Sequence, residues 1–149
     1  MVKCVEIVAL YDADPDALFA SALSFSEMTD AMAGLATYDG LPESGTANQG
    51  DVITVDVTFW GIFKQKGHRM IIERLDPANR IIQSRETSAA AKQWDHHLSI
   101  QPDAGLARWT DTIVIDAGWQ TPIVARFARY MYARRHRHRK ALEISQRIY

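Results

Sequence analysis

Hydrophobic residues along the chain follow a two-residue period in some stretches and a helical period in others. The first apolar run, residues 2–10, is rich in valine and isoleucine and predicts a strand. After a loop over 40–50, apolar residues at 53, 55, 57 and 59 alternate with polar ones, which is typical of a strand with one buried face. Further strand-like runs cover 68–75, 80–87, 93–101 and 106–116, and turn signals at 64–67, 76–79 and 102–105 separate them. This spacing predicts an antiparallel meander.

Helical patterns lie on either side of this meander. Asp14, Pro15 and Asp16 form a helix start signal, and Ser26 is a candidate cap for a second short helix. Near the C-terminus, Pro122 precedes an apolar stripe at i, i+4, i+7 and i+8 that begins at Ile123. No glycine or proline follows, so we expect one long helix over about residues 119–145.

The order of these elements predicts an α+β fold in a single domain covering residues 1–149. Strand twist should curl so long a sheet around the C-terminal helix. The one cysteine excludes an internal disulfide framework and a multi-cysteine zinc site. No apolar run approaches the length of a membrane span, and the first residues do not resemble a signal peptide. We therefore expect a cytoplasmic protein.

The formal net charge of −1 hides a strong asymmetry along the chain. Residues 1–118 hold 9 basic and 17 acidic side chains, whereas residues 119–149 hold 8 basic and 1 acidic. One interpretation is a basic helix packed on an acidic sheet. The alternative is a contact with RNA, an anionic membrane or another protein through the basic run 134–140. No aromatic residues are interleaved with this run, which argues against nucleic acid, and we expect no membrane partner.

Several short motifs resemble those of a known protein family. They are Asp14-Pro15-Asp16-Ala17-Leu18-Phe19, the stretch from Gly67 to Asp76-Pro77, Trp94-Asp95-His96-His97, Thr110-Asp111, and Arg135-His136-Arg137 after Tyr132-Ala133. In this order and spacing they resemble the START-like polyketide cyclase/dehydratase (SRPBCC) superfamily. The resemblance implies a helix-grip fold, in which a curved antiparallel sheet wraps around a long C-terminal helix and two short helices follow the first strand. It also implies a hydrophobic cavity for lipids, quinones or polyketides, and in some members cyclisation or dehydration. The lead-in to the last helix, Gly118-Trp119-Gln120-Thr121-Pro122, departs from the glycine- and leucine-rich pattern of the family.

Hairpin loops fix which side chains share a face of the sheet, because side chains alternate along a strand. A four-residue loop at 102–105 places His96 opposite Asp111 on a mainly apolar face. Four-residue loops at 88–91 and 76–79 then place Gln83 opposite His96, and Arg85 between Trp94 and Met70 on the two neighbouring strands. The sequence thus predicts a polar row of Gln83, His96 and Asp111 on the inner face, with Arg85 close enough to Trp94 for a cation–π contact.

Asp111 and His96 are the candidate catalytic residues. A carboxylate beside an imidazole orients its tautomer and raises its pKa, as a general base requires. The same pair could instead hydrogen-bond a ligand, or be purely structural, with Asp111 paired to His96 or to Arg135.

The candidate ligand-binding residues form the rest of the predicted inner face and the facing stripe of the helix. They are Phe59, Met70, Gln83, Arg85, Trp94, Trp109, Phe127 and Met131. Trp60 falls on the outer face in this register and is a candidate contact in a homodimer.

No metal site is expected, since His96 and His97 point to opposite faces of a strand and His136 and His138 point in different directions on a helix. No phosphate-cradling glycine motif is present, and we expect no cofactor. The leading hypothesis is a module that binds a small lipophilic ligand: aromatic, polyketide-like, quinone-like or lipid. The alternatives are a cyclase/dehydratase-type enzyme using His96 and Asp111 for proton transfer, and an RNA- or protein-interaction module acting through the basic helix.

Overall fold

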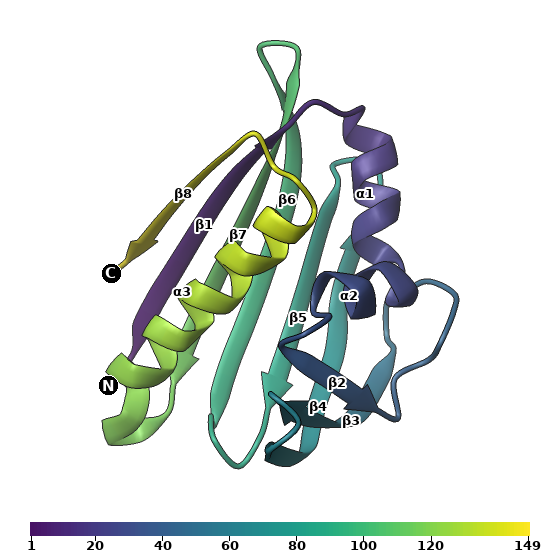
Figure 1. Cartoon of the computed structure of the whole chain (residues 1–149). Coiled ribbons are helices and arrows are strands. Elements are labelled where there is room, and N and C mark those ends of the chain that lie inside the picture. Colours follow the sequence, from purple (N-terminus) through teal and green to yellow (C-terminus); the bar gives the residue numbers. More distant parts are fainter.

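The computed structural model describes all residues, Met1–Tyr149, and contains one eight-stranded antiparallel sheet in the order β2-β3-β4-β5-β6-β7-β1-β8. A long helix lies across one face of this sheet (Figure 1). The elements are β1 (Lys3–Tyr11), α1 (Pro15–Leu23), α2 (Phe25–Ala31), β2 (Ala36–Asp39), β3 (Val52–Phe59), β4 (Phe63–Asp76), β5 (Ile81–Thr87), β6 (Gln93–Asp103), β7 (Leu106–Asp116), a short 3₁₀ helix (Gly118–Gln120), α3 (Thr121–His138) and β8 (Glu143–Ile148). This arrangement confirms the α+β helix-grip fold.

The two short helices carry the chain from β1 to β2, at the opposite edge of the sheet (Figure 1). Asp14 caps α1 by accepting a hydrogen bond from the Ala17 backbone N–H at 2.9 Å, with Pro15 in the first turn. Ser24, rather than Ser26, caps α2 and accepts from the N–H of Glu27 at 3.3 Å.

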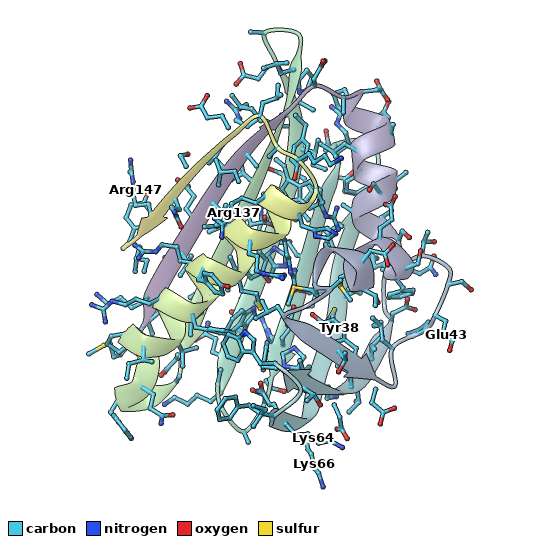
Figure 2. All side chains as sticks on the ribbon, viewed as in Figure 1. Tyr38, Glu43, Lys64, Lys66, Arg137 and Arg147 are labelled. Carbon is cyan, nitrogen blue, oxygen red and sulfur yellow. The ribbon has the colours of Figure 1, made fainter.

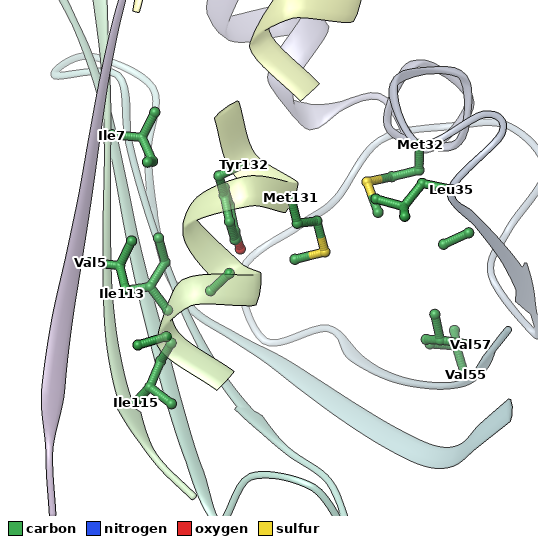
Figure 3. Packing of buried hydrophobic residues seen from close by; sticks show 13 residues of the cluster. Val5, Ile7, Met32, Leu35, Val55, Val57, Ile113, Ile115, Met131 and Tyr132 are labelled. Atoms are coloured by element: carbon green, nitrogen blue, oxygen red, sulfur yellow. The ribbon is translucent and has the colours of Figure 1, made fainter. Parts of the chain in front are cut away.

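The backbone of α3 lies close to β1, β7 and β8, whereas α3 reaches β3 only through long side chains such as Phe127. Two of its buried alanines, Ala125 and Ala128, belong to the same hydrophobic cluster as Val5, Ile113 and Ile115 (Figure 3). Small side chains permit this close approach on one flank of the helix. On the other flank, Met131 projects toward the half of the sheet that contains β3 (Figure 3).

The long C-terminal helix is shorter than the sequence predicts. It ends at His138, because Lys140 adopts a left-handed conformation with φ 63°. The Ala141 N–H donates to the His136 carbonyl and the Lys140 N–H to that of Arg137, which is the pattern of a Schellman motif. The chain then reverses into β8, an edge strand on β1 that the sequence pattern did not reveal.

The predicted position of the turn between β3 and β4 is also wrong. It lies at 60–62 rather than 64–67, with Trp60 and Gly61 at φ 51° and 68° and the Ile62 N–H donating to Phe59 O. Residues 64–67 are part of β4, a 14-residue strand. Trp60 therefore occupies a hairpin tip, where its ring contacts those of Phe63 and Phe127, and not the outer face of the sheet.

The connection between β5 and β6 contains five residues, 88–92, where four were expected. The Ser88 N–H donates to Ala91 O within this loop, and Lys92 is the additional residue. A one-residue slip exchanges the two faces of a strand. Ser84 and Glu86 consequently face His96 and Trp94 on the inner face, while Gln83 and Arg85 face outward. The prediction that Gln83 and Arg85 line the cavity is therefore wrong.

The β6–β7 hairpin differs from the expected register by two residues, which preserves the faces. Its turn is Ala104-Gly105, so His96 lies opposite Ile113, and Asp111 opposite Leu98. His96 and Asp111 are therefore diagonal neighbours on one face instead of a direct pair.

We predict that Lys140→Gly will raise the free energy of unfolding by about 0.5–1 kcal/mol, because glycine adopts the left-handed conformation without the penalty paid by lysine. Urea unfolding of the purified protein measures this change. Arg137→Gly, inside α3, is the control and should lower the same quantity by about 1 kcal/mol. Equal destabilisation by both variants would mean that the helix continues through residue 140.

Candidate ligand-binding cavity

A cavity of about 480 Å³ lies between the inner face of the sheet and α3. Of its 34 lining residues, 23 are hydrophobic, so the wall is mainly apolar. Six of the eight predicted ligand-binding residues line it: Phe59, Met70, Trp94, Trp109, Phe127 and Met131. The cavity exists because α3 sits against β1 and β7, while the strands from β3 to β5 curve away from it (Figure 1).

Aromatic rings form much of the wall near the first turns of α3. Phe127 meets Phe59 edge to face, with ring centroids 5.2 Å apart. Deeper in the cavity the Trp94 and Tyr132 rings stack at 6.5 Å. These contacts join the helix to β3 and β6 across the cavity.

Asp111 is the centre of a buried hydrogen-bond network, and its side chain is 2% exposed. One carboxylate oxygen accepts from Nε2 of His96 at 2.7 Å and from Nε1 of Trp109 at 3.1 Å. The other accepts from Nε2 of His136 at 2.8 Å. The helix residue that meets Asp111 is thus His136; of the two pairings considered for Asp111, the one with His96 is present and the one with Arg135 is not.

The network continues from His136 to Tyr11 of β1, whose hydroxyl lies 2.6 Å from Nδ1. Burial raises the pKa of the Tyr11 hydroxyl well above its ordinary value, so it remains protonated and can donate this bond. A neutral imidazole with its proton on Nε2 satisfies both contacts of His136.

The hydrogen bonds determine the charge state of Asp111. Burial alone would raise the pKa of this carboxyl, but hydrogen bonds from His136 and His96 outweigh it and hold the pKa below its ordinary value. Asp111 is therefore ionised and acts only as an acceptor. His96 gives Nε2–H to Asp111, which leaves its Nδ1 without a protein partner in the cavity wall.

A second buried carboxylate, Glu86 on β5, lies in the cavity wall and was missed by sequence reasoning. Its oxygens accept from Nε2 of His68 at 2.6 Å and from the Ser84 hydroxyl at 3.1 Å. Burial would raise the pKa of Glu86, yet the hydrogen bond from His68 keeps it below the ordinary value. The only signal for this residue was the β5 register, which depends on a loop length that the sequence does not mark.

Gln83 and Arg85 lie on the opposite side of the sheet from the cavity. Arg85 is largely exposed and pairs with Glu73 at 3.2 Å and with Asp95 at 3.6 Å. No cation–π contact with Trp94 forms, because the two side chains point to opposite faces.

The basic run 134–140 is divided between the cavity and the surface. Arg135 and Arg139 line the cavity, their guanidinium groups 4.6 Å from the Tyr132 ring centroid and 4.8 Å from that of Trp109. Arg137, His138 and Lys140 are exposed. The run is therefore not one continuous basic surface.

Two kinds of feature are absent from the structure. No group of three or more histidine, cysteine, aspartate or glutamate residues is arranged to hold a metal ion. No helix is both long enough and apolar enough to span a bilayer.

We predict that Asp111→Asn will lower the free energy of unfolding at neutral pH by about 1–3 kcal/mol, because three buried donors then share a weaker acceptor. In the unmodified protein this free energy should fall as the pH drops below about 4, since the unfolded carboxyl takes up a proton there while the folded one stays ionised. The fall should be smaller in Asp111→Asn, and Glu86, Asp76 and Asp116, whose pKa values are also lowered, contribute to the part that remains.

Urea unfolding at a series of pH values measures both effects. Asp12→Asn, at an exposed position, is the control and should leave the pH dependence unchanged. An unaltered acid response in Asp111→Asn would contradict the assignment.

Comparison with known proteins supports the fold and identifies a family. The structure matches 175 chains of solved structures. One is the crystal structure of Ara h 8.0201, with a TM-score of 0.65 and 11% identity, covering 93% of this chain and 97% of that chain. At this identity the likeness shows the fold alone, the helix-grip architecture. No curated protein has a significantly similar sequence. A family model described as "Domain of unknown function (DUF8410)" matches residues 25–142, which is most of the chain, and the protein is therefore a member of the DUF8410 family.

Proposed function

We propose that this protein binds a small lipophilic ligand in the cavity between the sheet and α3. The observation that carries this proposal is the cavity itself, about 480 Å³ with a mainly apolar wall. Small-molecule sites are typically concave, apolar and about 300–1,000 Å³ in volume, with a few polar groups that orient the ligand.

The wall suggests how such a ligand is held. Its apolar body would contact Phe59, Met70 and Phe127 near the start of α3, with Trp94 farther along the cavity. Burial of this surface supplies most of the binding free energy. Nδ1 of His96 then offers a hydrogen-bond acceptor to a polar group of the ligand, because its Nε2–H is already committed to Asp111.

A substitution that fills the cavity tests this proposal directly. We predict that the neutral fluorophore N-phenyl-1-naphthylamine binds the unmodified protein and binds Met70→Trp about tenfold more weakly or less, since the indole occupies the space. Arg69→Trp is the matched control, because the neighbouring side chain is exposed and is not part of the cavity wall. Fluorescence titration measures the affinity. Failure of the unmodified protein to bind, or equal losses in both variants, would refute the proposal.

Proton transfer is a second candidate function, favoured by the geometry of His96 and Asp111. The 2.7 Å contact orients the imidazole, and the unpartnered Nδ1 is the atom that could accept a proton from a bound substrate. A cyclisation or dehydration would use this atom as a general base, with Asp111 stabilising the imidazolium that forms.

The tautomer of His96 tests this second function. At about pH 8, where an unperturbed imidazole is neutral, we predict that His96 carries its proton on Nε2. Nitrogen-15 NMR of the histidine side chains distinguishes the two ring nitrogens, and His96→Phe assigns the signal. A proton found on Nδ1 would remove the base and leave ligand binding as the remaining function of the cavity.

The third hypothesis, an RNA or protein contact through the basic helix, has less support. Arg135, His136 and Arg139 face the interior, so fewer positive groups are available on the surface than the sequence suggests.

A further inference from the structure

We infer that the ligand is a lipophilic carboxylate, whose charged head binds between Arg135 and Arg139 at the C-terminal end of α3. This inference rests on the proposed ligand binding and adds the chemical class of the ligand. It follows from hydrogen-bond donors in the cavity wall that the protein itself does not satisfy.

The two arginines are neighbours on one face of α3. They are four residues apart, which is about 6 Å along the helix axis. Two positive charges at this spacing repel each other. Burial lowers the pKa of the Arg139 guanidinium below its ordinary value, as expected for a cation removed from water, whereas burial of Arg135 is outweighed by nearby tyrosines and carboxylates, which raise its pKa. An anion placed between the two groups would relieve the repulsion.

Neither guanidinium has an anionic partner within the protein. The oxygens of Asp111 are taken by His96, Trp109 and His136. Those of Glu86 are taken by His68 and Ser84. The arginines thus line the same cavity as two carboxylates whose oxygens already accept hydrogen bonds from other side chains.

The unused donors are numerous. The side-chain hydrogen bonds of Arg135 are limited to one, from Nε to the sulfur of Met32 at 2.9 Å. Arg139 stacks on Trp109, and its Nη1 is buried without a hydrogen-bond partner. A guanidinium has five N–H donors arranged to grip a carboxylate through two parallel bonds. Arg80, by comparison, donates to the Ile100 carbonyl and forms an ion pair with Asp16 at 2.8 Å.

The charge of the wall favours one negative charge on the ligand over two. The wall contains two arginines, Arg135 and Arg139, and two carboxylates, Asp111 and Glu86, so these four charges balance before a ligand binds. A carboxylate adds one negative charge, whereas a phosphate dianion would add two. The apolar part of the ligand would extend toward Phe127, about 18 Å from Arg139 along the helix.

Dodecanoate and 1-dodecanol have the same apolar chain and differ only in the charged head, so their comparison isolates the contribution of the anion. We expect isothermal titration calorimetry of the purified protein, at about pH 8 where a carboxyl is ionised, to show dodecanoate binding at least tenfold more tightly than dodecanol. The double variant Arg135→Gln/Arg139→Gln should reduce this ratio to about one. Arg137→Gln removes an exposed positive charge from the same helix (Figure 2) and should leave the ratio unchanged.

The outcomes separate this inference from the proposed function. Binding of dodecanol with equal or weaker binding of dodecanoate would overturn the carboxylate site and leave lipophilic binding intact. Absence of binding by either compound would overturn both. In a third outcome, Arg137→Gln reduces the preference for dodecanoate as much as the double variant does. That result would show that the anion is attracted by surface charge, and it would also overturn the site. The comparison of the two compounds in the unmodified protein tests the inference even if the double variant does not fold. In that case Arg139→Lys takes the place of the double variant. We expect Arg139→Lys to lower the ratio of dodecanoate affinity to dodecanol affinity severalfold.

Discussion

The buried carboxylate of Asp111 is the interaction on which the arrangement of helix and sheet depends. It projects from β7, accepts from His96 on β6 and from His136 on α3, and reaches Tyr11 on β1 through His136. The β6–β7 hairpin is therefore joined through one ionised group to α3 and to β1, which lies at the other end of the chain. Burying a charge is costly unless its hydrogen bonds are complete, so folding must bring all these donors together or leave Asp111 unpaired. The network therefore fixes where the last turns of α3 cross the sheet.

The shape of the cavity follows from an asymmetry along α3. Alanines such as Ala125 and Ala128 pack against β1 and β7, which brings that flank of the helix close to the sheet. The other flank carries Phe127, Met131 and Arg135, whose large side chains keep the helix away from β3, β4 and β5. Large side chains on one flank and small ones on the other tilt the helix over the curved sheet (Figure 1). The cavity is thus a direct consequence of the small side chains on one flank of α3 and the large ones on the other. It does not require an unusual backbone conformation.

The fold could be predicted from the sequence because most strands carry a clear contrast between their two faces. In β3 the alternation of Val55 and Val57 with polar residues leaves one choice of buried face, and His96 and Asp111 keep their shared face even though the register moves by two residues. The site was predicted less well, because Ile81–Thr87 has polar or charged residues on both faces and gives no such contrast. One extra loop residue, Lys92, then decides the orientation of β5 and exchanges Arg85 for Glu86 in the cavity. The end of α3 was missed for a similar reason: lysine rarely adopts the left-handed conformation that ends this helix, so composition alone does not mark it.

Counting charges along the sequence does not reveal which groups pair with each other in the structure. A basic helix does pack on a sheet that carries buried carboxylates, but histidines rather than arginines provide their direct partners. Every oxygen of Asp111 and Glu86 accepts at least one hydrogen bond from a histidine or serine, and neither carboxylate forms an ion pair with an arginine, so the nearby arginines act on them only at longer range. This division of roles leaves the guanidinium groups with free donors. The cavity therefore has an apolar end formed by aromatic rings and a donor-rich end near Arg139, and a purely hydrocarbon ligand would leave that second end unsatisfied.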